Sequence, residues 1–193
     1  MNVNAKKRGR PSRKGTALKP EMIIDTAKQL MVEQGKIPSI RQLATALQVD
    51  AMAIYHYFKS KAVLLEAVTT SLISDIYQPV VRVESGAEVA TEWQAELHQL
   101  CLSYLHLLEQ YPGLLETLLS MESEGPAEVF AQRFTIIVEP LELDPPAVES
   151  ALALLVDYLH GFALAMNCNQ DRDALNPQMI EGPLGLYCKA IFC

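Results

Sequence analysis

Cysteine is scarce in this chain of 193 residues, and its four cysteines are scattered at positions 101, 168, 188 and 193. No two of them have CxxC spacing, so we expect free thiols in a reducing cytoplasm. Long apolar runs are also missing, since none reaches the roughly 20 residues that a membrane-spanning helix needs. The basic N-terminus has no apolar segment like that of a signal peptide. The sequence therefore predicts a cytoplasmic protein without a membrane segment.

Catalytic motifs are lacking as well. The sequence contains no GxGxxG, P-loop, HExxH or GxSxG pattern. His98 and Cys101 have the i, i+3 spacing that could begin a metal site, but His106 lies off that line and no carboxylate completes the set. His160 near Asp157 could be a base with an orienting acid, but no nucleophile is apparent. We expect no enzyme activity, no cofactor and no metal site, and a small helical enzyme is the least favoured alternative.

Positive charge is nearly absent from two thirds of the chain. Residues 1–61 hold 12 Lys and Arg against 4 Asp and Glu, a net charge of +8. Residues 62–193 hold 4 against 19, a net charge of −15, and the two parts sum to the −7 of the whole chain. Such asymmetry is typical of a nucleic-acid-binding end on an acidic body. The acidic body should be repelled by DNA, which helps determine the end that docks.

The stretch 39–61 contains two short predicted helices joined by a tight turn. Ser39 can N-cap the first helix, and Gln42 three residues later completes a capping box. Residues 47–50 are expected to form the turn, and Asp50 can N-cap a second helix from Ala51 to about Phe58. Ile54 and Phe58 should point inward, which leaves the rest of this small helix for other faces. This is the build of a helix-turn-helix, whose second helix enters a DNA major groove.

Residues 22–66 resemble the N-terminal DNA-binding domain of the TetR family of bacterial transcription regulators. The pattern that carries the resemblance is S-I-R-x-L-A, then L-x-V, then I-Y-x-Y-F-x-x-K-x-x-L-L. The matching residues are Ile23, Ile24, Ala27, Leu30, Gly35, Ser39, Ile40, Arg41, Leu43, Ala44, Leu47, Val49, Ile54, Tyr55, Tyr57, Phe58, Lys61, Leu64 and Leu65. One position departs from the family, because Gln48 stands where glycine is usual. A non-glycine residue with positive φ adds some strain to that turn.

The resemblance implies which residues contact DNA. Arg41 matches a position that contacts a base or phosphate, and Ser39 matches a cap that often touches phosphate. The base-facing start of the recognition helix corresponds to Ala51, Met52 and Ala53. Phosphate contacts correspond to Tyr55, Tyr57 and Lys61, with His56 as a further candidate. The alternative for Tyr55 and Tyr57 is partial core packing with a solvated hydroxyl.

The recognition helix has few side chains that can read bases. Ala51, Met52 and Ala53 can make only apolar contacts with thymine methyl groups. Residues 1–19 are expected to be a disordered basic arm, within which Lys7-Arg8-Gly9-Arg10-Pro11 resembles an AT-hook core. We therefore expect Lys7, Arg8 and Arg10 to contact the minor groove or phosphates, the alternative being a solubilising tail. Selectivity would then rest on Arg41, methyl contacts and groove shape.

The remaining chain predicts only helices, so the fold class is all-α. Expected domains are the arm, a helix-turn-helix domain over 20–66 and a helical ligand-binding and dimerisation domain over 67–193. The first domain should begin with a helix from Pro20 to Gly35. Further helices are predicted over 61–78, 90–111, 114–121, 125–138, 145–167 and 183–192, with loops over 79–89 and 168–182. The helix over 61–78 would join the two domains and act as a lever.

The helix predicted over 145–167 is apolar on two faces. One face holds Leu155 and Leu159, and the other holds Ala151, Leu154, Tyr158, Gly161 and Ala165. Because Gly161 and Ala165 permit close helix approach, we expect the second face to form a homodimer interface. The resemblance implies the same, since the family usually dimerises through C-terminal helices. A two-fold dimer also suits a palindromic DNA site, whereas the alternative is the central helix of a monomer core.

A ligand-responsive regulator, most often a repressor in this family, is the function that the resemblance implies. Candidates for lining a small-molecule pocket are Trp93, Tyr104, Met121, Phe130, Phe134 and Tyr158, although each could simply pack in the core. The alternative is a TetR-like DNA-binding protein whose C-terminal domain binds a protein partner. Partners expected overall are double-stranded DNA with a palindromic operator, a second copy of the chain and an unknown small-molecule effector.

Overall fold

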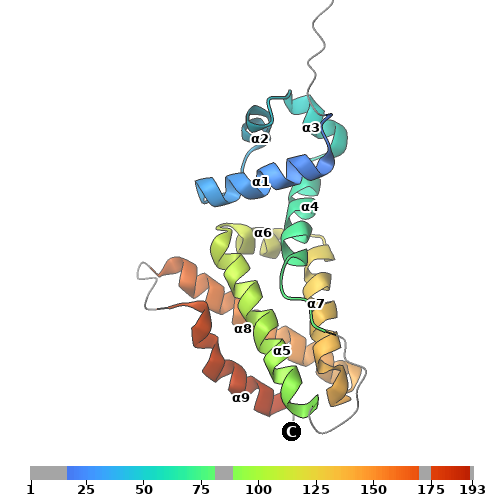
Figure 1. Ribbon diagram of the computed structural model, residues 1–193, viewed down its shortest axis with the longest axis vertical. Coiled ribbons are helices and arrows are strands. Elements are labelled where there is room, and N and C mark those ends of the chain that lie inside the picture. The colour runs from blue at the N-terminus through green and yellow to red at the C-terminus, as the bar shows by residue number, and fades with distance from the viewer. Residues whose placement is uncertain (1–16, 81–88, 170–174, 192–193) are drawn as a thin grey trace, which may run out of the picture.

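The computed structural model describes residues 17–80, 89–169 and 175–191, and within these ranges it contains helices and no strand. The all-α fold class is therefore confirmed. Among the described residues, the first three helices form a head at one end of the molecule, and the fourth leads out of it (Figure 1). The remaining five α-helices, with two 3-10 helices, form a body at the other end. Most of the expected arm over 1–19, together with residues 81–88 of the expected loop over 79–89 and residues 170–174 of the expected loop over 168–182, lies outside the described residues.

The head consists of α1 (Pro20–Gln34), α2 (Ile40–Ala46) and α3 (Ala51–Tyr57). Pro20 begins α1, and Gly35 ends it with φ 63°, a left-handed conformation that glycine adopts without strain. The capping box at α2 is present: the Gln42 amide donates to Ser39 Oγ, and Gln42 Oε1 accepts from the Ser39 amide at 2.8 Å. Local sequence signals therefore predicted both helix boundaries correctly.

The connecting helix α4 (Lys61–Ser74) is shorter than predicted. Ser60 caps its start by accepting from the Val63 amide at 3.2 Å. The predicted end at Gln78 is wrong, because the helical hydrogen bonding stops four residues earlier and Asp75 and Ile76 close it with tight turn bonds. Pro79 therefore lies beyond the helix rather than at its end.

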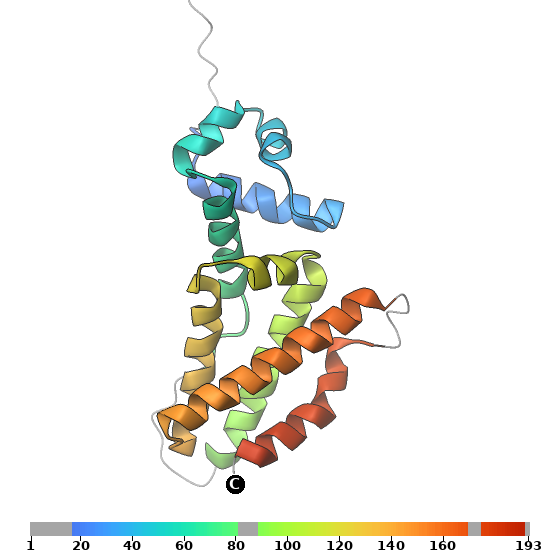
Figure 2. The ribbon, with the colours of Figure 1, turned by 180° about the vertical axis from the view of Figure 1, so that it is seen from behind.

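The body packs around α5, with α7 on one side and α8 across its far face (Figures 1 and 2). Its elements are α5 (Val89–Gln110), α6 (Leu114–Ser120), α7 (Gly125–Val138), the 3-10 helix η1 (Glu139–Leu141), α8 (Pro145–Cys168), the 3-10 helix η2 (Pro177–Ile180) and α9 (Glu181–Ile191). The last helix begins at Glu181 rather than at the predicted 183, and η2 occupies part of the predicted loop. Asp144 N-caps α8 by accepting from the Ala147 amide at 2.8 Å.

One continuous apolar core runs from the head through α4 into the body. An apolar stripe along α5 is buried as a whole, and its members are Trp93, Leu97, Leu100, Tyr104 and Leu107. In contrast, α8 is apolar but poorly covered. By length and composition it meets the criteria for a membrane-crossing helix, with a mean hydropathy of 1.4, yet only 28% of that window is buried. Much of α8 therefore presents apolar side chains to the outside of the chain.

Candidate nucleic-acid interface

The turn between α2 and α3 has the geometry expected from a helix-turn-helix. Leu47 donates to the Leu43 carbonyl at 2.9 Å, and Val49 donates to the Ala44 carbonyl at 3.0 Å, so the chain closes tightly. Gln48 has φ 53°, which confirms the positive φ predicted for this position. The turn thus keeps the geometry usual for glycine although it carries a side chain, which is exposed.

The recognition helix α3 is anchored on one side and open on the other. Ile54 is fully buried and Phe58 is 7% exposed, so these two attach the helix to the head as predicted. Asp50 caps its start by accepting from the Met52 amide at 2.8 Å. Met52 is 71% exposed, the highest fraction among the large apolar residues described. An exposed methionine at the first turn of a short, anchored helix is a surface feature suited to a partner.

Other side chains around α3 form a polar rim. Tyr55 and His56 are exposed, whereas Ala51 and Ala53, on either side of Met52 in the sequence, are half-buried. Arg41 and Lys61 are also exposed, Arg41 at the start of α2 and Lys61 at the first position of α4. The predicted residues within the described ranges therefore lie on the same three elements, with Ser39 at the α2 cap. Lys7, Arg8 and Arg10 lie outside the described residues.

Tyr57 has a partner that the sequence did not suggest. Its hydroxyl donates to the Leu18 carbonyl at 2.5 Å, which links the end of α3 to the residues just before α1. Because the phenol has a single proton, it cannot donate to a phosphate while this bond is made. Tyr57 therefore holds the point where the N-terminal arm leaves the head, close to the recognition helix. A bond between residues 39 positions apart has no local sequence signal.

The six candidate pocket residues divide into two groups. Four of them pack in the core, namely Trp93, Tyr104, Phe130 and Phe134, while Met121 and Tyr158 are half-buried. The Tyr104 ring lies 5.0 Å from that of Phe130. Trp93 is 3% exposed, and its indole Nε1 has no hydrogen-bond partner among the described residues. A buried donor without a partner is unusual and is a place where a ligand acceptor would be favourable.

Tyr104 also contacts His160 across α5 and α8, with 2.8 Å between the hydroxyl oxygen and Nε2. Burial lowers the pKa of His160, although Asp157 opposes the shift. The neutral imidazole is therefore favoured, with Nε2 accepting from the tyrosine. His160 and Asp157 thus contribute to a helix–helix contact, and no nucleophile in the described chain adds to them.

The predicted dimer residues lie mostly on the outside of α8. Leu154 is 61% exposed, and Gly161 and Ala165 are exposed as well. A Cβ built on Gly161 would meet no atom within 4 Å, so that face is open. Tyr158 is half-buried, whereas Ala151 is 7% exposed and packs inside the body, with its carbonyl accepting from the Tyr187 hydroxyl at 2.8 Å. On α9, Leu186 is 69% exposed and extends the uncovered apolar surface.

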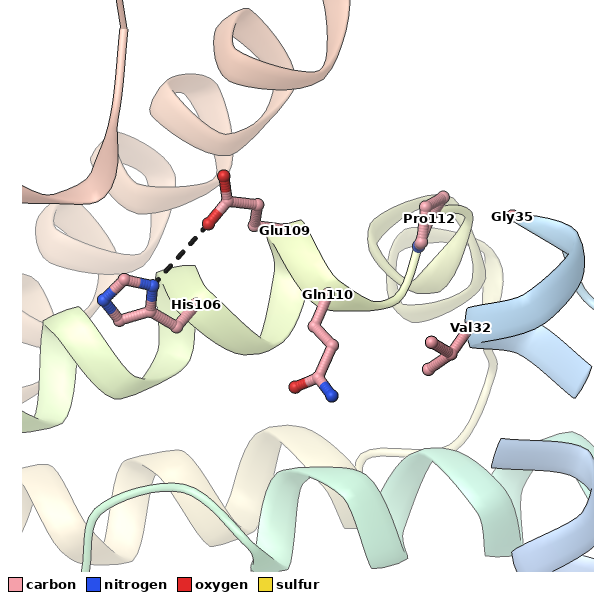
Figure 3. Close-up of a pocket in the computed structure, with 6 residues that line it drawn as sticks. All are labelled: Val32, Gly35, His106, Glu109, Gln110 and Pro112. Carbon is pink, nitrogen blue, oxygen red and sulfur yellow. Dashed lines mark ion pairs between the residues drawn. The ribbon is translucent and has the colours of Figure 1, made fainter. Parts of the chain in front are cut away.

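An open pocket of about 550 Å³ lies where the head meets the body, between the end of α1 and the end of α5 (Figure 3). Its lining comes from Val32, Gly35, His106, Glu109, Gln110 and Pro112. His106 Nδ1 and Glu109 Oε2 are 3.6 Å apart, and both side chains are partly exposed. None of the six predicted pocket residues lines it. Pattern reasoning missed this pocket because its walls come from the ends of two distant helices.

Metal and thiol chemistry find no support in the described part of the chain. No group of three or more His, Cys, Asp and Glu residues there is arranged to hold a metal ion. Burial raises the pKa of the Cys101 thiol, and it raises that of Cys188 to about 11. Both thiols are therefore protonated at neutral pH, and a protonated thiol is a poor nucleophile.

A family model of the bacterial regulatory proteins of the TetR family matches residues 23–68, which span the helix-turn-helix and the start of α4. A search of curated proteins found no match. Among solved structures, apo ActR from Streptomyces coelicolor is similar at 14% identity and a TM-score of 0.76, covering 92% of this chain and 96% of that chain. BioQ bound to its natural double-stranded DNA operator is similar at 18% identity and a TM-score of 0.68, covering 91% and 98%.

A TetR variant from Acinetobacter baumannii AYE in complex with minocycline is similar at 20% identity and a TM-score of 0.67, covering 91% of this chain and 94% of that chain. Identities this low establish a common fold along nearly the whole length and nothing finer. The matched head, whose caps, turn and exposed α3 have the geometry described above, is similar to the DNA-binding domain of the TetR family of bacterial regulatory proteins. The chain as a whole has the fold of these solved structures.

Proposed function

We propose that the chain is a homodimeric repressor that binds a palindromic operator and leaves it when a small molecule enters the body. The observation that carries this proposal is the open face of α3, supported from behind by Ile54 and Phe58. The α3 surface suits a major groove, because a short exposed helix fits into the groove and the flanking basic side chains can meet the phosphates. Two such helices are needed to read two half-sites, so the proposal includes a dimer.

The residues proposed to contact DNA form a base-facing centre and a phosphate-facing rim. Ala51, Met52 and Ala53 face thymine methyl groups, and Arg41 reaches a base or phosphate. Phosphates are met by the exposed side chains at the rim, which are Ser39, Tyr55, His56 and Lys61. Tyr57 acts mainly through Leu18, by directing the basic arm with Lys7, Arg8 and Arg10 toward the adjacent groove. Selectivity therefore depends on few hydrogen bonds to base edges.

Binding-site selection with three proteins tests this division of roles. The Arg41→Ala variant and a chain lacking residues 1–15 are each expected to relax the selected sequence relative to the unmodified protein. A Lys36→Ala variant serves as a control for lost charge, because that exposed lysine of the head is not among the residues proposed to contact DNA. If neither Arg41→Ala nor the deletion alters the selected sequence, the proposed source of specificity is wrong.

The proposed dimer interface is the uncovered apolar face of α8 with the neighbouring surface of α9. Leu154, Leu164 and Leu186 are each at least half exposed there, and exposed glycines on both helices leave room for close approach. Each Å² of apolar surface that is buried contributes about 25 cal/mol of stabilisation. Packing this face against the same face of a second copy is therefore strongly favourable. A helix as apolar as α8 with so little of it covered is hard to explain in a lone monomer.

The proposed effector is a largely apolar or aromatic small molecule that also carries a hydrogen-bond acceptor. Apolar surroundings come from the aromatic residues of α5 and α7, and the buried indole of Trp93 offers a donor that has no partner among the described residues. Structures of similar fold contain ligands, as the minocycline complex shows for the Acinetobacter protein. The ligand must bind the DNA-released state more tightly than the DNA-bound state, because equal affinity shifts nothing.

A body that binds a protein partner instead is the second candidate. It is favoured by the dense packing of Tyr104, Phe130 and Phe134, each no more than 5% exposed, which leaves little room for a ligand among them. Thermal-shift screening of small molecules separates the two. Under the first proposal, a compound that raises Tm also releases operator DNA, and a Trp93→Phe variant responds less. Under the second, no compound does both, and release follows addition of a protein.

A further inference from the structure

A side chain from α7 holds the C-terminal end of α4. Arg133 Nη2 donates to the Ser74 carbonyl at 2.8 Å, and Nη1 donates to the Ile76 carbonyl at 2.7 Å. Longer contacts of 3.3 Å join Nη1 to the carbonyl oxygens of Ile73 and Tyr77. The last carbonyls of a helix have no partners within it, and a cation there also meets the negative end of the helix dipole. Arg133 therefore caps α4 from outside the helix.

A second bond attaches α4 to the same side of the body. The Ser123 hydroxyl, just before α7, donates to Glu66 Oε1 at 2.5 Å, and Ser123 Oγ accepts from the Gly125 amide at 3.3 Å. Glu66 and Ser74 are eight residues apart, which is about 12 Å along a helix. Two attachments separated by that distance determine a direction as well as a position, so the tilt of α4 against α7 is defined.

The end of α4 is also the meeting point of the other elements. Lys28 of α1 pairs with Asp75 at 2.8 Å. The Tyr77 amide donates to Ser103 Oγ at 2.9 Å, and its hydroxyl donates to Glu96 Oε2 at 2.7 Å, both on α5. The far end of α4 leads directly into the recognition helix through residues 58–60 (Figure 1). One end of α4 is thus held by three helices, while the other carries the DNA-binding surface.

We propose that Arg133 is a positioning residue that sets the tilt of α4 and, through it, the separation of the two recognition helices on DNA. This inference rests on the proposed dimeric DNA binding. With 14 residues, α4 is about 21 Å long, so a tilt of about 10° moves its far end by roughly 4 Å. Successive base pairs are about 3.4 Å apart, and the two-fold doubles the effect. A small change in the tilt of α4 therefore changes the preferred separation of the two half-sites by one or two base pairs.

The experiment is selection from a DNA library in which two half-sites are separated by spacers of varying length. Arg133→Met removes the guanidinium but keeps an apolar stem, and Arg133→Lys keeps the charge with fewer donors aimed at the carbonyls. Gln132→Met, an exposed neighbour on α7, is the matched control. We expect one narrow spacer preference for the unmodified protein and the control, and a preference broadened or shifted by one or two base pairs for Arg133→Met. Arg133→Lys should fall between them.

Spacer preference separates positioning from stability, because a merely destabilised protein binds less DNA without choosing a different spacing. Far-UV circular dichroism checks that each variant is folded. Should Arg133→Met not fold, Ser123→Ala decides the question, since it removes the bond to Glu66 together with the longer one from the Gly125 amide and should broaden the spacing more weakly. A folded Arg133→Met, or Ser123→Ala in its place, that keeps the narrow preference overturns the inference alone. An unmodified protein that selects no paired half-sites overturns the proposed function and this inference together.

Discussion

Gln48 stores strain in the turn of the helix-turn-helix, and replacing it with glycine should release that strain. Its φ of 53° lies in the left-handed region, where a Cβ crowds the following carbonyl oxygen. The side chain is exposed and makes no hydrogen bond within the described part of the chain, while the backbone amide of Gln48 donates to the Thr45 carbonyl at 3.1 Å. Substitution therefore changes backbone energy with little loss of packing.

The magnitude follows from two opposing effects. A left-handed residue other than glycine costs roughly 1–2 kcal/mol. Glycine gives back roughly 0.4–1 kcal/mol of this through the greater freedom of the unfolded chain. We therefore expect Gln48→Gly to raise the free energy of unfolding by about 0.5–1 kcal/mol, and Gln48→Ala to leave it nearly unchanged. For a chain of this size, such a gain raises Tm by roughly 1–4 °C.

Urea unfolding of the full chain, followed by far-UV circular dichroism, measures the difference between Gln48→Gly and Gln48→Ala. Ala46→Gly is the matched control, because it introduces glycine two residues earlier at an exposed helical position. There, glycine should lower stability by up to about 1 kcal/mol. Opposite signs at positions 46 and 48 support the strain argument. Equal or lower stability of Gln48→Gly relative to Gln48→Ala would refute it.

Three further predictions concern other contacts. Because burial lowers the pKa of His160 below the usual 6.5, the unfolded chain binds a proton that the folded chain resists, so stability should fall as pH drops below about 6.5. In urea titrations at pH 7.5 and 5.5, the free energy of unfolding should differ less between the two pH values for His160→Gln than for the parent. An equal difference in both proteins would contradict this. Tyr57→Phe should cost about 1 kcal/mol by losing the Leu18 bond, whereas a stability equal to the parent's would show that bond to be unimportant. Leu154→Glu combined with Leu186→Glu should give a folded monomer by sedimentation velocity, and a persistent dimer would move the interface elsewhere.

The parts of the fold that depend on neighbouring residues were predictable from the sequence. Ser39 and Asp50 cap helices as predicted, because a cap acts within three residues along the chain. The strained turn at Gln48 was likewise predicted, since the resemblance located a position that requires positive φ. Local chemistry and the family pattern agree here, so the head could be predicted almost completely.

Contacts between distant segments were not predictable in the same way. Arg133 lies 59 residues from Ser74, and nothing in either stretch indicates that one caps the helix of the other. The same holds for Tyr57 and Leu18, and for the early end of α4, where tertiary bonds replace the helical ones. An arginine on an amphipathic helix has the same local pattern whether it is solvated or bonded to four carbonyls.

The candidate pocket shows a different limit of sequence patterns. Aromatic residues at helical spacing are apolar whether they pack against each other or around a ligand, so Phe134 and Tyr104 satisfied the pattern for both. In the structure both side chains are buried in the core, and the feature that favours a ligand is the Trp93 indole, a buried donor without a partner in the described part of the chain. For the proposed dimer interface on α8 the pattern was more informative. Each of the two apolar faces of that helix has to pack against a different partner, and the body of one chain supplies only one of them.

The central claim is that this chain reads paired half-sites in DNA as a dimer, and one measurement addresses it directly. Selection of bound duplexes from random DNA, followed by titration of the selected site at several salt concentrations, reports sequence, stoichiometry and charge together. We expect an inverted repeat, two chains on each duplex, and an affinity that falls by about 10³–10⁵-fold between 50 and 200 mM salt for 6–10 phosphate contacts. No enriched repeat, together with an affinity that hardly changes with salt, would contradict the claim.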